Sequence, residues 1–251
     1  MTRRRFYAPQ IAFSGDAKTV RLGADEARHV RDVLRLGRGD EVYVFDGEGR
    51  EYRCALAEVT PREITLEVFG EVQPARPESP LHLTLAVALL KGEKFDLVVQ
   101  KATELGVTRL VPLTTARADV RIREPEDAQK KLDRWERIAF EAAKQCGRAR
   151  LMLVDAPINF DEWLRSIVDV QLKVMYTARD GGSAAEAFKM EFKTARIVAM
   201  IGSEGGWTDD ELIQARANGW RLVTLGGRTL RAETAAIVGA ALLQHRFGDL
   251  L

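Results

Sequence analysis

The sequence predicts a two-domain protein, in which a small β-barrel with one helix precedes an α/β domain with a mostly parallel sheet. Three observations indicate this organisation. The first 70 residues contain short alternating runs, residues 73–80 hold three prolines, and strand-like and helix-like segments alternate from residue 81 onward. A chain of 251 residues with 46% hydrophobic composition is long enough to bury the cores of two domains.

A β-hairpin is expected in the N-terminal domain. Residues 42–46 alternate with the period of a strand, a Gly-Glu-Gly turn follows, and a second run starts at Glu51. Residues 62–72 predict a further strand.

One helix is expected between Asp25 and Leu36 of the same domain. Its apolar residues recur at helical spacing and are expected on one side: Ala27, Val30, Val33 and Leu34. Residues 1–38 carry nine Lys/Arg against four Asp/Glu, whereas residues 39–72 carry three against nine. This asymmetry is compatible with a basic face, although ordinary surface charge would have the same composition.

The segment QPARPESP, residues 73–80, marks the expected domain boundary. Proline fixes φ and removes a backbone donor, so a stretch this rich in proline suits a linker. The sequence therefore predicts an N-terminal domain at 1–72, a linker at 73–80 and a second domain at 81–251.

The second domain begins with a near-continuous apolar run at 81–90, which is typical of a strand buried on both faces. Further strands are expected at 107–113, 171–178, 196–202 and 220–226. Helices are expected at 94–105, ended by Gly106, at 128–146, ended by Gly147, and at 160–167, 208–219 and 233–247. This alternation predicts a mostly parallel sheet that is covered by helices.

The loop from Gly202 to Trp207 lies between an apolar strand and a helix. Thr208, with Glu211 three residues later, matches a capping box, so the helix is expected to begin at about Thr208. Ligands of parallel α/β sheets bind at the carboxyl ends of strands, and glycine lets main-chain groups approach a ligand closely. A tight turn without a ligand is the alternative at this point.

The residues of this loop disfavour a phosphate ligand. The chain has no GxxxxGKS/T or GxSxG sequence, and Gly-Ser-Glu-Gly-Gly is not GxGxxG, which disfavours a hydrolase or a nucleotide-dependent oxidoreductase. Glu204 and the acidic residues that begin the next helix would repel a phosphate but tolerate a cation. A sulfonium or an adenosine therefore suits the loop better than a pyrophosphate.

A second irregular segment, LGGRTLRAETAAIVGAALL at 225–243, follows the next predicted strand. It contains a charged cluster, Arg228, Arg231 and Glu233, before a helix that Thr234 could cap. A solvated loop with local ion pairs would have the same composition. Residues 235–243 are apolar on every side, which requires enclosure by the chain's own loops or by a second subunit.

The remaining composition indicates a cytoplasmic protein. Cys54 and Cys146 form no CxxC and no cluster, so a disulfide framework or zinc site is not expected and a reducing cytosol fits. The N-terminus MTRRRFYAPQ lacks an apolar h-region, and no window approaches about 18 uninterrupted apolar residues. Neither a signal peptide nor a membrane span is expected.

Taken together, these segments resemble the RsmE-type ribosomal RNA uridine methyltransferases of the SPOUT superfamily. The similarity rests on the two glycine-containing segments at 201–212 and 225–243. It also includes RRFYAP at 4–9, HVRDVLRLGRGDEVYVFDGEG at 29–49, LLKGEKFDLVVQKATELGVTRLVPL at 89–113 and EAAKQCGR at 141–148. The match covers nearly the whole chain in the same order, although Ser203 stands where the family usually has proline.

The resemblance implies a PUA-like N-terminal barrel, a Rossmann-like SPOUT methyltransferase domain with a deep trefoil knot, and a homodimer. It also implies S-adenosylmethionine (SAM) as cofactor and N3 of one uridine in small-subunit 16S ribosomal RNA as the target. The implied cofactor-binding residues follow three strands: Thr177, Ile201, Gly202, Glu204, Gly205, Gly206, Leu225, Gly226, Leu230, Arg231, Ala232, Thr234 and Ala235.

N3 of uracil is protonated at neutral pH, so methyl transfer needs a base or a group that stabilises the uracil anion. Arg231 is expected to stabilise O2 or O4, and Glu233 to accept the proton or to orient Arg231; alternatively, this pair only fastens the loop. Candidate RNA contacts are Arg3, Arg4, Arg5, Arg28, Arg31, Arg35, Arg38, Lys91, Lys94 and Arg148. Another RNA target, or a non-catalytic RNA-binding protein of the same fold, are the alternatives.

Overall fold

The computed structural model describes residues 3–60, 63–122, 124–191 and 195–250. The chain forms two compact units: residues 1–78 with 143–151, here called the N-terminal unit, and residues 79–142 with 152–251, the C-terminal unit. The first division falls inside the proline-rich segment, whereas nothing in the sequence indicated that residues 143–151 join the N-terminal unit. The domain bounds 1–72, 73–80 and 81–251 stay a prediction, and their outer ends, residues 1 and 251, lie outside the described residues.

The N-terminal unit contains a five-stranded sheet in the order β1-β3-β4-β5-β2. Its strands are β1 (Arg5–Tyr7), β2 (Thr19–Arg21), β3 (Glu41–Phe45), β4 (Glu51–Val59) and β5 (Ile64–Val72). The expected hairpin is confirmed, because β3 and β4 pair antiparallel on either side of the Gly-Glu-Gly turn. Apolar residues of all five strands share one core with the helix of this unit.

The helix of the N-terminal unit differs from its expected form. It begins as α1 (Ala24–Arg28) and continues directly as a π-helical turn, η2 (His29–Val33). A separate short 3₁₀ turn, η1 (Gln10–Ala12), lies earlier in the chain. Ala27 and Val30 are buried as expected, but Val33 and Leu34 are 65% and 38% exposed, so their placement on the buried side was wrong. A π turn has more residues per turn than an α-helix, which rotates the residues that follow away from the core.

The C-terminal unit is built on an eight-stranded sheet in the order β11-β13-β10-β12-β6-β7-β8, with β9 also pairing with β7. The strands are β6 (Leu81–Ala88), β7 (Arg109–Thr114), β8 (Leu153–Val154), β9 (Ile158–Asn159), β10 (Leu172–Tyr176), β11 (Gly182–Ser183), β12 (Ala195–Ile201) and β13 (Arg221–Thr224). Every pairing is parallel, as the alternating pattern predicted. The apolar β6 lies between β12 and β7 and is buried on both faces.

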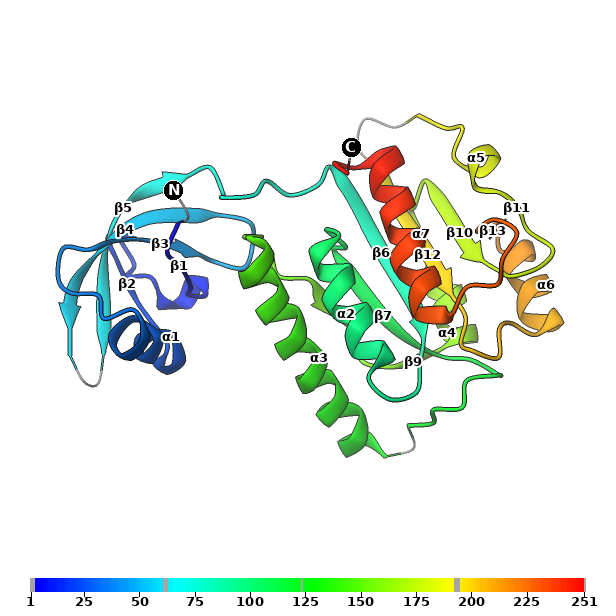
Figure 1. The fold of residues 1–251 in the computed structure, drawn as a ribbon, viewed down its shortest axis with the longest axis horizontal. Helices are drawn as coiled ribbons and strands as arrows, with labels where there is room; N and C mark the ends of the chain where they lie inside the picture. The colour runs from blue at the N-terminus through cyan, green and yellow to red at the C-terminus, as the bar shows by residue number, and fades with distance from the viewer. Residues whose placement is uncertain (1–2, 61–62, 123, 192–194, 251) are drawn as a thin grey trace. The chain divides into compact units, whose positions relative to one another are not determined.

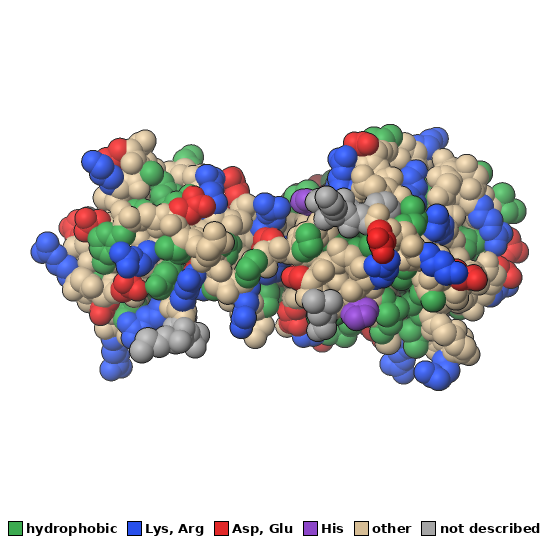
Figure 2. Space-filling view, turned by 90° about the horizontal axis from the view of Figure 1, so that it is seen from above, with side chains coloured by type: hydrophobic (Ala, Val, Ile, Leu, Met, Phe, Trp, Pro, Cys, Tyr) green, Lys and Arg blue, Asp and Glu red, His purple; other side chains and the backbone are tan. Residues whose placement is uncertain are grey.

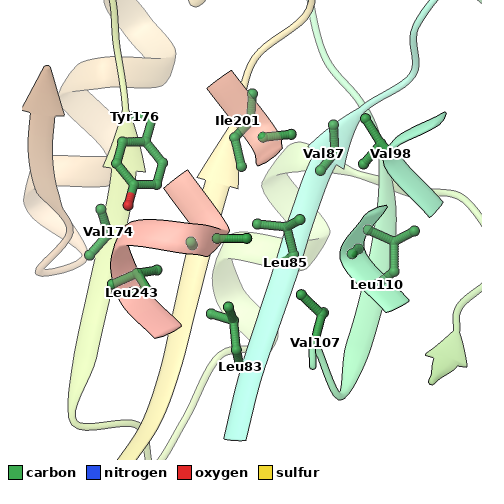
Figure 3. Close-up of a cluster of buried hydrophobic side chains, with 14 of the residues drawn as sticks. Leu83, Leu85, Val87, Val98, Val107, Leu110, Val174, Tyr176, Ile201 and Leu243 are labelled. Atoms are coloured by element: carbon green, nitrogen blue, oxygen red, sulfur yellow. The ribbon is translucent and has the colours of Figure 1, made fainter. Parts of the chain in front are cut away.

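Helices cover both faces of this sheet (Figure 1). They are α2 (Lys94–Glu104), α3 (Pro125–Cys146), α4 (Phe160–Ser166), α5 (Ala184–Ala187), α6 (Asp209–Ala217) and α7 (Ala232–Phe247). Residues of α2, α3, α5 and α7 share one core with Leu83 and Leu85 of β6, and Figure 3 shows part of this core. Residues of α4 and α6 share the other core with Ala86 and Val111. No helix in the described ranges is long and apolar enough to cross a membrane.

Several helix ends agree with the sequence. Gly106 and Gly147 follow α2 and α3 with φ of +74° and +88°, the left-handed conformation that glycine adopts without strain. Thr208 caps α6, and its hydroxyl and the Glu211 side chain form the expected capping box. The expected cap at Thr234 was wrong, because α7 begins at Ala232 with Arg231 in the capping position. The side chain of Arg231 makes no capping hydrogen bond there.

Gly239 of α7 is a predicted determinant of stability. A Cβ there would lie 2.6 Å from a ring carbon of Tyr176, whose hydroxyl donates to the Gly239 carbonyl at 3.1 Å. We expect Gly239→Ala to lower the free energy of unfolding by about 1 kcal/mol, because overpacking costs about 1–3 kcal/mol and the helix-propensity gain offsets about 1 kcal/mol of it. Urea unfolding measures this difference, and Tyr176→Phe, which removes only the hydrogen bond, is the control. A Gly239→Ala variant more stable than the parent would contradict the packing argument.

Candidate functional site

Three neighbouring strands end at one edge of the sheet. β10 pairs with β12 on one side and with β13 on the other, and all three are parallel. Their last residues are Tyr176, Ile201 and Thr224. Since carboxyl ends of parallel strands meet at the same edge, the loops that follow are brought together although they are separated in the sequence.

A cavity of about 890 Å³ lies among these loops. This volume is within the range of small-molecule sites, roughly 300–1,000 Å³. Twelve of the thirteen expected cofactor-binding residues line it: Thr177, Ile201, Gly202, Glu204, Gly205, Gly206, Leu225, Gly226, Leu230, Arg231, Ala232 and Ala235. Thr234 does not line the cavity, because its position in the first turn of α7 exposes it elsewhere.

The cavity also has walls that the sequence did not single out as cofactor contacts. Ser203, Gly227 and Arg228 lie inside the expected loops, so taking whole loops instead of single residues would have included them. Lys94, expected to contact RNA, lines the cavity too. Arg117 follows β7 and belongs to no recognisable motif, so no signal in the sequence could have found it.

The glycines of the loop Gly202–Trp207 are required by close contacts. A Cβ at Gly202 would lie 3.1–3.3 Å from the Trp207 indole, and one at Gly205 would lie 2.9 Å from the Arg117 carbonyl oxygen. Gly206 has φ of +67°, and its N–H donates to the Ser203 carbonyl at 2.9 Å, which closes the turn. The bare backbone is thus explained by contacts within the protein as well as by access to the cavity.

Trp207 and Tyr176 anchor the wall of the cavity from within the core. The Trp207 indole N–H donates to the Tyr176 carbonyl at 2.8 Å, and Trp207 is 4% exposed. Both residues also line the cavity, so Trp207 is at once a loop anchor and a wall. Burial raises the pKa of the Tyr176 hydroxyl far above its usual value, which keeps it protonated as a donor to Gly239 and disfavours it as a base.

A carboxylate and an ammonium group meet at the cavity. Lys94 Nζ lies 2.8 Å from Glu204 Oε1. Burial pushes the pKa of the Glu204 carboxyl upward, but hydrogen bonds from Lys94 and from backbone groups outweigh it, so the pKa lies below its ordinary value. Glu204 is therefore ionised at neutral pH. Lys91 forms a separate exposed pair with Asp119 at 2.8 Å, and this pairing raises the pKa of Lys91.

Two arginines of the third loop stand at the cavity without a partner. Arg228 and Arg231 are exposed and line the cavity, and their guanidinium groups make no hydrogen bond or ion pair among the described residues. Glu233, by contrast, is 8% exposed, does not line the cavity, and its Oε2 is buried without a hydrogen-bond partner. In the described part of the chain no hydrogen bond or ion pair joins the side chains of Arg231 and Glu233, so the structure does not support the expectation that Glu233 orients Arg231.

The candidate RNA contacts of the N-terminal unit fall into two groups. Arg5 is mostly buried, pairs with the fully buried Glu51 at 3.0 Å, and donates to the Arg148 carbonyl at 2.9 Å. Arg148 is 6% exposed and pairs with Glu78 at 2.8 Å. Most of these donors have internal partners and both side chains are largely buried, which disfavours Arg5 and Arg148 as RNA contacts. Arg3 also pairs with Glu51, at 2.8 Å, and keeps 31% of its side chain exposed.

The other arginines of this unit face solvent. Arg28 lies 4.0 Å from Asp25 and Arg31 pairs with Asp32 at 2.7 Å, both in exposed positions. Arg4, Arg35 and Arg38 are exposed and make no ion pair among the residues that the structure describes. Acidic side chains are interspersed with basic ones on the face drawn in Figure 2. Binding of a polyanion by this unit would therefore depend on these few arginines more than on the overall charge.

Known proteins share these features. Residues 77–244 match the family described as RNA methyltransferase domain, and residues 22–69 match the family described as RNA methyltransferase PUA domain. The ribosomal RNA small subunit methyltransferase E of Synechocystis sp. is 37% identical over 89% of this chain and 72% of its own length. The protein of the same name from Bacillus subtilis is 28% identical over 92% of this chain and 91% of its own.

Solved structures give the same result. The ribosomal RNA small subunit methyltransferase E of Neisseria gonorrhoeae, bound to SAM, superposes with a TM-score of 0.87 at 32% identity over the full length of both chains. A Legionella pneumophila protein described as a methyltransferase, in complex with SAM, gives 0.86 at 30% identity, also over both full lengths.

The two family matches, together with a parallel α/β domain that has a cavity at its strand ends, place the chain among RNA methyltransferases. The chain belongs to the ribosomal RNA small subunit methyltransferase E family, as its segments at 201–212 and 225–243 indicated. The expected fold, a PUA-like domain before a SPOUT methyltransferase domain, is thereby confirmed. The trefoil knot stays a prediction.

Proposed function

We propose that this protein transfers the methyl group of SAM to N3 of one uridine in 16S ribosomal RNA of the small subunit, and that it acts in the cytoplasm. The observation that carries the proposal is the cavity formed by three strand-end loops, whose walls include the glycines at 202, 205, 206, 226 and 227. The names of the relatives support a small-subunit ribosomal RNA as substrate. The choice of uridine N3 rests on the family resemblance.

The cavity suits SAM in size. Bound SAM supplies an activated methyl group on a sulfonium. The carboxylate of Glu204 stands at the wall and is ionised, but Lys94 pairs with it at 2.8 Å, so its attraction for a cation is weak. The glycine backbone at 202, 205 and 206 leaves main-chain groups accessible to an adenosine and a methionyl moiety. The loop after β10, with Thr177, and the loop from Leu225 to Ala235 complete the proposed cofactor site.

Arg231 is the proposed catalytic residue. For N3 to be methylated, its proton must leave to a base or to water. The guanidinium of Arg231 would stabilise O2 or O4 while negative charge develops on the uracil ring. Glu233 stays a proposal as the proton acceptor. Its Oε2 is buried without a hydrogen-bond partner and is therefore available to accept a proton. Because Glu233 does not line the cavity, its side chain would have to move to reach the uracil ring.

The proposal includes a homodimer and a knotted methyltransferase domain. One side of α7 is buried in the chain, but a stripe of apolar residues on the same helix stays partly exposed: Ile237, Val238, Ala241 and Leu242. Leu97 of the neighbouring α2 is 40% exposed as well. A second subunit placed on this stripe would complete the burial that the all-apolar sequence of 235–243 requires.

Charge at Glu204 should distinguish SAM from its demethylated product. We expect Glu204→Gln to raise the Kd of SAM by about threefold, because a partly exposed carboxylate attracts the sulfonium weakly. The Kd of neutral S-adenosylhomocysteine should stay unchanged. Lys94→Met should act in the opposite direction on SAM, since it leaves the carboxylate uncompensated. Isothermal titration with both ligands measures this, and equal effects on the two ligands would exclude a charge mechanism.

The exposed arginines of the N-terminal unit should contribute to RNA binding through phosphate contacts. We expect the logarithm of the binding constant for a ribosomal RNA fragment to fall linearly with the logarithm of salt concentration. Arg35→Ala and Arg38→Ala should each reduce that slope by about one. Arg21→Ala is the matched control, because Arg21 already pairs with Glu63 at 2.9 Å. Filter binding across a salt series tests this, and identical slopes for all variants would rule out these contacts.

The activity itself is tested on under-methylated small ribosomal subunits. Incubation with SAM that carries a labelled methyl group, followed by nuclease digestion and mass spectrometry, should yield one labelled 3-methyluridine in 16S RNA. Label in another RNA or at another atom would mean that the enzyme has a different target from the one proposed. RNA binding without any label, together with no binding of SAM, would support a non-catalytic RNA-binding protein.

A further inference from the structure

Residues 115–121, here called the clamp segment, connect two parts of the C-terminal unit that the topology separates. The segment follows β7, whereas the glycine loop 202–207 follows β12, and β6 lies between these two strands. It contacts the loop nonetheless. The Ser203 hydroxyl donates to the Arg117 carbonyl at 3.0 Å, and Arg117 Nη1 donates to the carbonyls of Trp207 at 3.0 Å and of Gly205 at 3.4 Å. The two segments are therefore bonded in both directions.

The clamp segment is itself held in place. Arg121 donates to the carbonyls of Thr115 and Ala116, each at 2.8 Å. The N–H of Ala116 donates to Glu211 Oε1 at 2.9 Å, while the other oxygen of Glu211 accepts from the N–H of Thr208 at 2.8 Å. Glu211 is only 6% exposed, so one buried carboxylate joins the clamp segment to the start of α6. The backbone of the clamp segment is thus held by Arg121 and by Glu211. A segment held in this way can restrict the conformation of the loop that it contacts.

Arg117 holds one side of two peptides of the loop. A peptide unit is planar, so a fixed carbonyl oxygen also restrains the N–H of the following residue. Arg117 holds the carbonyl oxygens of residues 205 and 207, while the N–H groups of the same peptides donate to the Ser203 carbonyl at 2.9 Å and to Glu211 at 2.8 Å, so both sides of each peptide are held. The absence of a side chain at Gly205 allows this approach, since a Cβ would lie 2.9 Å from both the Cβ and the carbonyl oxygen of Arg117.

We infer that Arg117 is a positioning residue of the cofactor site, acting through the glycine loop. This inference deepens the proposed function and rests on it. A loop that is released from Arg117 populates several conformations, and the apparent Kd of a ligand rises in inverse proportion to the population of the competent one. The hydroxyl of Ser203 contributes the second bond of the same contact. Cofactor affinity, and not the chemical step, is the quantity that the clamp segment sets.

The test compares Arg117→Ala with Arg117→Lys and with Arg165→Ala. Arg165 is the matched control, because it also donates to a backbone carbonyl, that of Asp161 in its own helix α4, and makes no hydrogen bond to the glycine loop among the described residues. We expect Arg117→Ala to raise the Kd of SAM about tenfold through the loss of its hydrogen bonds, with kcat at saturating SAM nearly unchanged. Arg117→Lys, which keeps a charged donor, should recover most of the affinity, and Arg165→Ala should match the parent.

Hydrogen exchange measured without SAM distinguishes two explanations of a raised Kd. If Arg117 only contacted the ligand, its loss would not change exchange in the ligand-free protein. The peptide that covers residues 203–208 should exchange faster in Arg117→Ala and at the parental rate in Arg165→Ala. A raised Kd with unchanged exchange would mean that Arg117 contacts the ligand directly, and faster exchange with an unchanged Kd would mean that the clamp does not set affinity. Either result overturns the inference. If the parent protein binds no SAM, the proposed function fails, whereas the exchange comparison still tests the clamp.

Discussion

Arg231→Ala is expected to lower kcat by about 10²- to 10³-fold, the effect of removing one preorganised group that stabilises developing negative charge. Arg231 stands at the cavity, at the N-terminal end of α7, and no hydrogen bond or ion pair in the described part of the chain engages its guanidinium. The group is therefore available to the uracil ring. The Kd of SAM should change by only a few-fold, because the charge that Arg231 stabilises arises on the RNA and not on the cofactor.

Single-turnover methylation of under-methylated subunits at saturating SAM measures this effect. Arg179→Ala is the matched control, since Arg179 lines the same cavity but pairs with Asp209 at 2.8 Å. The methylation rate of Arg179→Ala should fall by less than about tenfold, because an exposed ion pair contributes little free energy. A parental rate for Arg231→Ala with unchanged SAM affinity would remove Arg231 from the catalytic step and leave it as a loop residue.

Gly205→Ala is expected to weaken SAM binding, with the Kd raised by about tenfold or more. The added Cβ would lie 2.9 Å from the Arg117 carbonyl oxygen, a backbone atom that cannot rotate away. The loop must then shift, and overpacking of this kind costs about 1–3 kcal/mol, which lowers both the stability of the fold and the population of the conformation that binds SAM. Displacement would also break the bonds between Arg117 and the carbonyls of residues 205 and 207.

Gly227→Ala is the comparison for stability. Gly227 belongs to the third loop, and a Cβ there has no heavy atom within 4 Å. The melting temperature should fall for Gly205→Ala and stay near the parental value for Gly227→Ala. Isothermal titration and thermal unfolding together measure both effects. If Gly205→Ala binds SAM with the parental Kd, the loop can adapt to the added Cβ, and its close contact with Arg117 does not affect SAM affinity.

The loops of the cofactor site could be predicted because each signal is local. The capping box of Thr208 and Glu211, the glycines before it and the apolar strands are all read within about a dozen residues. Parallel pairing of β12, β10 and β13 then brings three such loops to one edge. Alternation of strands and helices predicted the parallel sheet, whereas the expectation that these three loops form one site came from the family resemblance.

The features that the sequence did not reveal depend on distant contacts. Arg117 reaches the glycine loop only because β7 and β12 lie on either side of β6. Arg5 and Arg148 resembled RNA-binding arginines, but Glu51 and Glu78 hold them inside the N-terminal unit. The position of an arginine in the sequence does not show whether the fold places a buried carboxylate next to it. The exposure of Val33 likewise follows from a π turn that a period of 3.6 residues cannot predict.

A crystal structure of this protein with SAM bound tests the account most directly. The account predicts electron density for the cofactor between the loop 202–207 and the loop 225–231, with the sulfonium on the side of Glu204 and with Arg231 free to face the substrate. Density for SAM elsewhere on the protein, or an empty cavity at concentrations that saturate the related enzymes, would contradict it.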